Sequence, residues 1–452
     1  MTNGPFQRSS IFPGLLCILL GVLFLLARFN PDFRLWHVIW RFWPLLLIVW
    51  GVAKLIDNFA AQRTHENRPP LLTGGEAALL ILIFFTLAGM SVLSRVRERH
   101  PDMDIDIGMF NQDATAMQEL PSQAIPAGAH VTIHTDRGDV NVHAADDNDL
   151  RVSASKTAHG ASENAAQERV NIVDVRVEKT ADGYLIHPTN QDDARARVKV
   201  DLEITLPKSC VVTVNSGHGD INVAGIAGAV TAVSNQGNIE VHDSGSDVNA
   251  TVAKGDARIM NVKGSVRVSG RGSEIEVTDV AGDAIVSGEF YGPIRVRNVT
   301  KNTHYTSQKA DVQLVHLTGL LEFDSGNIEV SDVAGSAELV TQDKDIDAEN
   351  VAGKLQINDK NGTVKVGDSE PPREDINITN ASGAVELTLP AKSNFEINAV
   401  STSGEADSDF DDPTINTSND NGNGKIMGRV GSSGPKISIV TSYGSISLRK
   451  SS

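Results

Sequence analysis

The sequence predicts a β-solenoid, in which short strands stack coil upon coil, preceded by an N-terminal transmembrane region of three helices. Three observations support this fold class. A short pattern returns about every eighteen residues between 219 and 366, apolar residues recur at the same places in each copy, and three long apolar runs lie within residues 1–100. Self-similarity at a fixed period is the signature of a repeat architecture.

The first strand of each repeat has apolar residues at its third and fifth positions, as in Ile221 and Val223. These strands are GDINV (219–223), GNIEV (237–241), GDARI (255–259), SEIEV (273–277), GPIRV (292–296), ADVQL (310–314), GNIEV (326–330), KDIDA (344–348) and GTVKV (362–366). A second apolar run, such as AVTAV (229–233), lies between neighbouring copies. Residues two apart share one face of a strand, so we expect two inward-facing strands per coil of about 18 residues. A meander of eighteen-residue hairpins is the alternative.

The fourth position of each copy would point outward. It reads Asn222, Glu240, Arg258, Glu276, Arg295, Gln313, Glu329, Asp347 and Lys365. If coils stack in parallel register at about 4.8 Å, Arg258 lies between Glu240 and Glu276, and Arg295 lies next to Glu276. Exposed pairs of this kind contribute little individually.

The overall charge divides between the two ends of the chain. The net charge is −17, yet residues 1–100 hold ten Lys/Arg against five Asp/Glu, so residues 101–452 carry −22. An acidic solenoid repels phosphate backbones, which argues against nucleic acid as a partner. The two cysteines, Cys17 and Cys210, can build neither a disulfide framework nor a metal cluster.

Three apolar runs predict membrane helices at 11–27, 42–56 and 75–94, with the lipid bilayer as partner. The alternative of a signal peptide is disfavoured for the first run, because its n-region holds only Arg8 and no small-residue cleavage site follows. With three spans, the flanks on the solenoid's side carry six Lys/Arg and the opposite flanks four. The positive-inside rule thus slightly favours a cytoplasmic solenoid.

Residues 10–57 resemble the LiaI/LiaF-like transmembrane region. The resemblance rests on PGLLCILLGVLFLL (13–26) and FWPLLLIVWG (42–51). It implies a multi-pass protein of the bacterial inner membrane, and several proteins of that kind accompany envelope-stress signalling.

Residues 101–126 are predicted to form a linker, and 127–452 the solenoid domain. Asp102, Asp104 and Asp106 resemble a calcium loop, but the glycine spacing is wrong and no closing Glu follows. Ser162 begins a predicted capped helical insertion near 162–173. The polar stretch 407–425 is expected to be a loop.

From about residue 127 to 452 the chain resembles the bacterial β-strand-repeat family called "putative adhesin", whose function is unassigned. The residues that carry this resemblance are VDLEITLPKSCVVTVNSGHGDINV (200–223), LTLPAKSNFEINAVSTSGEAD (387–407) and PKISIVTSYGSISLRKS (435–451). The resemblance implies an extracytoplasmic solenoid, against the charge count.

The sequence contains one acidic candidate site. Asp343, Asp345 and Asp347 alternate along one stretch, and Glu329 and Lys365 would flank Asp347 across coils. Such a cluster could serve a glycan-cleaving enzyme or a divalent cation, but a solvated acidic face is the simpler interpretation. His130 and His134 share a strand face without a third metal ligand. We therefore assign no catalytic, cofactor-binding or metal residues, and no cofactor.

These features predict a non-enzymatic, membrane-anchored cell-envelope protein whose adhesin-like solenoid binds or scaffolds. Its partner would be an envelope polymer, a surface or a membrane signalling protein. One alternative is a membrane-bound regulator or sensor of an envelope-stress response. A more remote alternative is a glycan-acting β-helix enzyme.

Overall fold

The computed structural model describes residues 112–160, 162–191 and 197–451. The chain divides into two units, Met1–Asn111 and Gln112–Ser452. The predicted membrane helices at 11–27, 42–56 and 75–94, and the Asp102–Asp106 triplet, lie outside the described residues. Within the described ranges, no helix is both long and apolar enough to cross a membrane.

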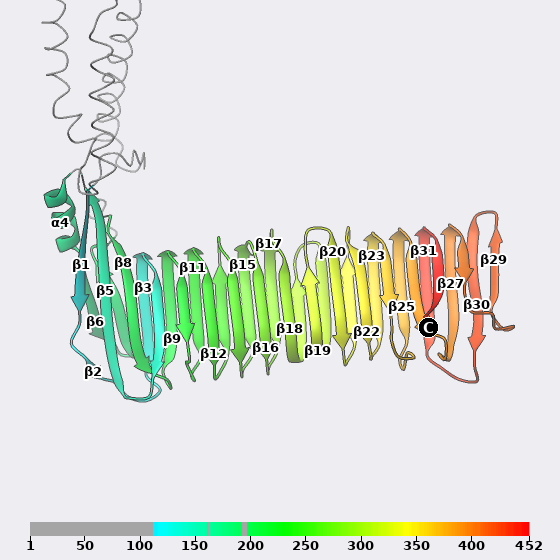
Figure 1. Cartoon of the computed structure of the whole chain (residues 1–452), viewed down its shortest axis with the longest axis horizontal. Helices are drawn as coiled ribbons and strands as arrows, with labels where there is room; N and C mark the ends of the chain where they lie inside the picture. Colours follow the sequence, from blue (N-terminus) through cyan, green and yellow to red (C-terminus); the bar gives the residue numbers. More distant parts are fainter. Residues whose placement is uncertain (1–111, 161, 192–196, 452) are drawn as a thin grey trace, which may run out of the picture. The chain divides into compact units, whose positions relative to one another are not determined.

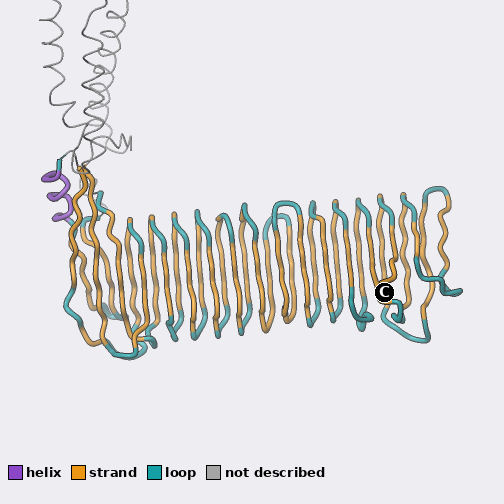
Figure 2. Tube along the Cα trace, in the orientation of Figure 1, coloured by secondary structure: helices purple, strands orange, loops and turns teal. Residues whose placement is uncertain are grey.

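The second unit is a β-solenoid built from two long strand ladders (Figures 1 and 2). In spatial order the first ladder contains β1 (Gln112–Glu119), β5 (Asp149–Gly160), β8 (Lys199–Pro207), β4 (Val140–Ala145), β10 (Ile221–Ala224), β12 (Ile239–Ser244), β14 (Ala257–Val262), β16 (Ile275–Val280), β18 (Ile294–Thr306), β19 (Ala310–Phe323), β20 (Asn327–Val333), β22 (Asp345–Val351), β24 (Val364–Gly367), β26 (Val385–Pro390), β32 (Ile446–Ser451) and β28 (Ala406–Ser408).

The second ladder contains β6 (Asp174–Lys179), β7 (Tyr184–Thr189), β3 (His130–Arg137), β9 (Val211–His218), β11 (Val230–Gln236), β13 (Val248–Val252), β15 (Val266–Gly272), β17 (Ala284–Phe290), β18 and β19 again, β21 (Ala337–Thr341), β23 (Leu355–Asn361), β25 (Ile376–Ser382), β31 (Lys436–Tyr443), β27 (Phe395–Ser403), β30 (Asn423–Val430) and β29 (Asn416–Asp420). The two-residue strand β2 (Gln123–Ala124) pairs with β5.

Most coils stack in parallel and in exact repeat register. Ile221 pairs with Ile239 in the first ladder, and Val230 pairs with Val248 in the second, each step spanning one coil. The inward residues of both ladders are buried and form one continuous apolar core. The predicted period and the two strands per coil are confirmed for these coils, and the hairpin meander is wrong for them.

One layer departs from the prediction of a wholly parallel solenoid. β18 and β19 each cross both ladders and pair antiparallel with one another. The ADVQL repeat therefore lies in the second ladder, where Val312 pairs with Tyr305 and Leu339. Leu321 pairs with Val330 in the first ladder. A period-two apolar pattern reads the same in both directions, so the sequence pattern does not reveal strand direction.

The predicted linker at 101–126 is partly wrong, because the N-terminal end of the solenoid (the proximal end) begins within it. Residues 112–119 form β1, which pairs antiparallel with β5, so the β unit begins inside the stretch 101–126. The helix α4 (Glu163–Ile172) lies in the predicted insertion, and the Ser162 hydroxyl accepts a hydrogen bond from the Ala165 N–H. The buried Lys156 ammonium donates to the Val173 carbonyl at 2.9 Å, at the C-terminal end of α4. Cations are favourable at that end of a helix.

At the C-terminal end of the solenoid (the distal end), the predicted loop at 407–425 is wrong, because this stretch contains β29 and the start of β30. Phe410 packs edge-on against Phe395 with ring centroids 5.2 Å apart. The Asn419 side chain accepts from the Ala406 N–H at 2.8 Å and donates to the Ala406 carbonyl at 3.0 Å. An amide thus occupies part of the place of a further strand beside β28, at this edge of the first ladder.

The turns that lead into the first ladder require glycine at a repeated position. Gly219 and Gly237 have φ values of 139° and 135°. A Cβ on Gly237 would lie 2.2 Å from the Gly219 carbonyl oxygen in the preceding coil. Only glycine tolerates both this conformation and this approach.

Polar side chains form a buried column inside the distal half of the second ladder. Asp359 pairs in register with Asn380, which pairs with Thr441. Asp359 is 5% exposed, and neither carboxyl oxygen completes a hydrogen bond. Burial raises the pKa of Asp359 to about 6, although the nearby Lys360 and Asn361 N–H groups lower it and Asp343 and Asp345 add to the rise.

Replacing Gly237 with Ala should destabilise the solenoid by about 2–3 kcal/mol, because the backbone strain and the contact with the Gly219 carbonyl act together. Chemical denaturation followed by circular dichroism measures this loss. Gly367→Ala is the matched control, since no atom lies within 4 Å of the added Cβ and φ is not positive there. Equal midpoints for the two variants would contradict the prediction.

Asp359→Asn should stabilise the protein at pH 7 by up to about 3 kcal/mol. The folded pKa, about 6, lies above the ordinary value of 3.8, so the folded state binds the proton more tightly. Wild-type stability from this group is therefore present below pH 4 and is lost as pH rises toward 6. The asparagine carries no charge, and its amide can donate to a turn carbonyl as Asn380 donates to Gly362 at 2.8 Å.

Denaturation midpoints measured between pH 4 and pH 8 test this expectation. The slope should become shallower in Asp359→Asn but should not vanish, because burial also raises the pKa of Asp368 to about 6. Asp347→Asn, which removes an exposed carboxylate from the first ladder, is the matched control for the loss of one carboxylate. A variant less stable than wild type at pH 7 would contradict the assigned role of the buried charge.

Candidate binding surface

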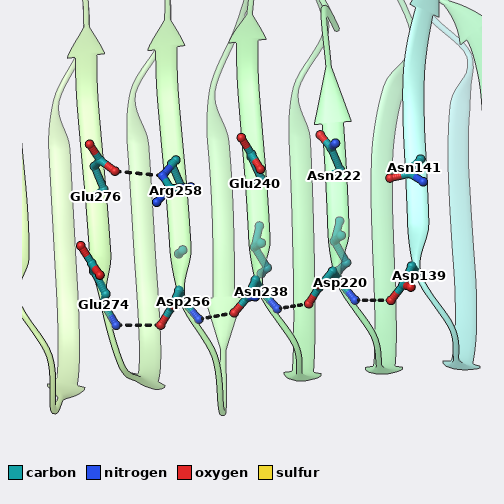
Figure 3. A pocket seen from close by; sticks show the side chains of 13 residues that line it. Asp139, Asn141, Asp220, Asn222, Asn238, Glu240, Asp256, Arg258, Glu274 and Glu276 are labelled. Atoms are coloured by element: carbon teal, nitrogen blue, oxygen red, sulfur yellow. Dashed lines mark hydrogen bonds and ion pairs between the residues drawn. The ribbon is translucent and has the colours of Figure 1, made fainter.

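Two polar rows run along the outer side of the first ladder between β4 and β16 (Figure 3). One row stands at the strand starts and contains Asp139, Asp220, Asn238, Asp256 and Glu274. Each of its first four side chains accepts a hydrogen bond from the backbone N–H of the next member, at 2.9, 2.7, 2.9 and 3.0 Å. These carboxylate and amide oxygens thus join successive coils.

This row was not predicted from the sequence, although the repeated motif that encodes it is visible there. Gly-Asp or Gly-Asn precedes the strand in the repeats at 219, 237 and 255. Only stacking shows that the polar residue after each glycine reaches the next coil.

The second row was predicted and is confirmed in this region. Asn222, Glu240, Arg258 and Glu276 pair in register. The Arg258 Nε atom donates to Glu276 at 2.9 Å, and this hydrogen bond raises the pKa of Arg258. Between the two rows lies an open groove of about 380 Å³. Five of its six carboxylates, all except Glu240, already accept hydrogen bonds from backbone or arginine groups, which fits structural and surface roles better than acid–base chemistry.

The predicted neighbours of Arg295 are only partly correct. Arg295 lies beside Glu276 in register, but its guanidinium pairs with Glu274 at 2.5 Å and with Glu322 at 3.2 Å. Glu322 takes the place predicted for Gln313, because β19 runs in the reverse direction. Gln313 lies in the second ladder instead.

The acidic stretch at 343–347 has the predicted neighbours. Glu329, Asp347 and Lys365 pair in register across β20, β22 and β24. Asp343 lies in the turn before β22 and accepts from the Asn361 amide at 3.2 Å, and Asp345 accepts from the Thr363 N–H at 2.7 Å. Two of the three predicted aspartates thus tie one coil to the next.

In the described part of the chain, no three His, Cys, Asp or Glu side chains are placed so that they could hold a metal ion. His130 and His134 do lie on one exposed side of β3. His134 faces Asp136 at 3.5 Å.

We call the outward side of the first ladder the charged face. From β12 to β26 its central row contains Glu240, Arg258, Glu276, Arg295, Glu322, Glu329, Asp347, Lys365 and Glu386. Every member of this row is ionisable. Its balance is acidic, with six carboxylates against three cations, so the face attracts cations and repels anionic polymers.

Comparisons with known proteins give two family matches and two similar structures. Residues 11–55 match the LiaI-LiaF-like transmembrane region. A putative cell adhesion protein from Clostridium sporogenes is 9% identical, with a TM-score of 0.17, covering 75% of this chain and 100% of that chain. A putative adhesin from Bacteroides fragilis is 10% identical, with a TM-score of 0.18, covering 75% and 97%. Such TM-scores support no structural argument.

No curated protein matches the chain. The longest family match covers residues 129–449, which include nearly all of the solenoid. The chain therefore belongs to the Toastrack DUF4097 family.

Proposed function

We propose that this protein is a non-enzymatic cell-envelope module, anchored in the inner membrane by its N-terminal region, whose solenoid presents a long binding or scaffolding surface. The observation that carries this proposal is the pair of exposed, continuous strand faces over one closed apolar core. A flat ladder offers repeated, equally spaced side chains to an extended partner, and its paired backbone resists deformation on binding.

The anchor is supported by the match of residues 11–55 to a transmembrane region. In this proposal, helices at 11–27, 42–56 and 75–94 cross the membrane, and residues 101–111 link them to a β unit at 112–452. The bilayer is then one partner, and the solenoid lies on the extracytoplasmic side of the membrane.

A second candidate is a membrane-bound regulator of an envelope-stress response. The observation that favours it is again the LiaI-LiaF-like match, since several proteins with that region accompany such signalling. In this case the solenoid would be an input or a scaffold for a signalling partner.

Fusions at Ser452 separate an outward from an inward solenoid. We expect a C-terminal alkaline phosphatase to be active and a C-terminal fluorescent protein to be dark, since phosphatase folds outside the inner membrane. Fusions after residue 60, in the loop between the second and third apolar runs, provide the opposite-side control. A fluorescent, phosphatase-inactive Ser452 fusion would overturn the exterior binding role and favour an intracellular scaffold.

Deletion of 112–452, with residues 1–111 retained, then distinguishes the two candidates. Loss of attachment or of cell aggregation, with unchanged stress-reporter output, supports the binding module. A changed reporter with unchanged attachment supports the regulator.

A further inference from the structure

The two outer faces of the solenoid differ in chemistry, and the strand register makes this visible. We call the two central rows on the outward side of the second ladder, from β3 to β27, the neutral face. One of its rows runs from Thr132 through Thr213, Thr231 and Asn249 to Asn398. The adjacent row runs from His134 through Asn215, Thr251 and Ser269 to Val400.

Charge is nearly absent from the neutral face. Along these two rows of described residues, only Arg267, Glu338 and Asp311 carry a formal charge, leaving His134 and His304 aside. The other members are Thr, Ser, Asn and Gln residues, together with Ile285 and four valines. By contrast, the central row of the charged face is ionisable at every position from β12 to β26. The acidic excess of the chain is therefore concentrated away from the neutral face.

Short neutral side chains suit a particular kind of partner. A hydroxyl or amide exchanges hydrogen bonds with another neutral group without the cost of removing a charge from water. Thr, Ser and Asn also lose less rotamer entropy on contact than Lys or Glu would. Their hydroxyls already form lateral contacts, since Thr251 and Ser269 lie 3.2 Å apart on neighbouring coils.

The remaining partner classes fit less well. A cationic polymer would prefer the charged face, and an anionic polymer is repelled by a chain of net charge −17. A second copy of the chain would bring two such charges together. The exposed apolar side chains of the neutral face, such as Val340 and Val440, are separated by polar ones and form no continuous dimer core.

We propose that the neutral face binds an extended, uncharged polysaccharide along the solenoid axis. Sugar hydroxyls would exchange hydrogen bonds with the Thr, Ser and Asn rows, while the aliphatic members contact the apolar faces of the sugar rings. Strands spaced about 4.8 Å apart repeat these contacts along the chain, so many weak contacts sum to useful affinity. This inference deepens the proposed envelope-binding function and rests on it.

Two matched pairs of isosteric substitutions test the assignment. Asn215→Asp with Asn249→Asp adds two negative charges to the neutral face, and Asn141→Asp with Asn327→Asp adds two to the charged face. Both variants have the same net charge and the same change in shape. Full-length protein, in a detergent without a sugar headgroup, is titrated against immobilised dextran and soluble β-glucan. Hyaluronate and polylysine provide anionic and cationic comparisons.

Wild type should bind at least one of the two neutral glucans and not hyaluronate. The neutral-face variant should bind about tenfold more weakly, a loss of ~1.4 kcal/mol, and the charged-face variant should remain within about twofold. Equal weakening by both pairs, binding to polylysine alone, no binding to either glucan, or self-association blocked by the neutral-face pair would each overturn the proposal. The Ser452 fusion result is independent of these outcomes, so a failure here leaves the envelope-module proposal separately testable.

Discussion

Main-chain hydrogen bonding from each coil to the next is the constraint on which the rest of this structure depends. Every strand between the two ends has partners on both sides, so the backbone groups of one coil are satisfied only if its neighbours hold the same register. This requirement fixes the coil length, keeps like residues in columns and leaves unpaired edges only at the ends.

The same constraint explains the residues at the turns. Where the chain bends between ladders, Asp243, Asn261 and Asp279 have φ values near 55–59°. Asp and Asn tolerate this conformation better than β-branched residues. Their side chains also form hydrogen bonds between neighbouring coils. The Asn261 amide donates to Asp243 at 2.5 Å, and the Asn298 amide donates to Asp279 at 2.8 Å. At each of these positions, one Asp or Asn residue therefore both favours the turn conformation and forms a hydrogen bond to the neighbouring coil.

The layer formed by β18 and β19 shows how the constraint accommodates an irregularity. The chain reverses there, yet both strands stay paired on either side, so the ladders continue without a gap. In this layer the core contains two aromatic rings, those of Tyr305 and Phe323, whose centroids lie 4.6 Å apart. Partner binding along a face would therefore cross this layer without meeting an open edge.

The sequence by itself determined the coil period, the two inward strands per coil and the neighbours of residues such as Arg258 and Asp347. Period-two alternation and an eighteen-residue repeat encode side-chain direction and stacking distance, because both are properties of consecutive residues. The family resemblances also followed from local motifs.

Only the tertiary structure decided the direction of β19, the pairing of β1 with β5 and the closure of the distal end by β29 and β30. Each depends on contacts between residues distant in sequence, and alternation looks the same for parallel and antiparallel strands. The same holds for the buried Asp359 and for the separation of a charged from a neutral face. A side chain's environment is set by which coil lies beside it, and that is known only once the coils are stacked.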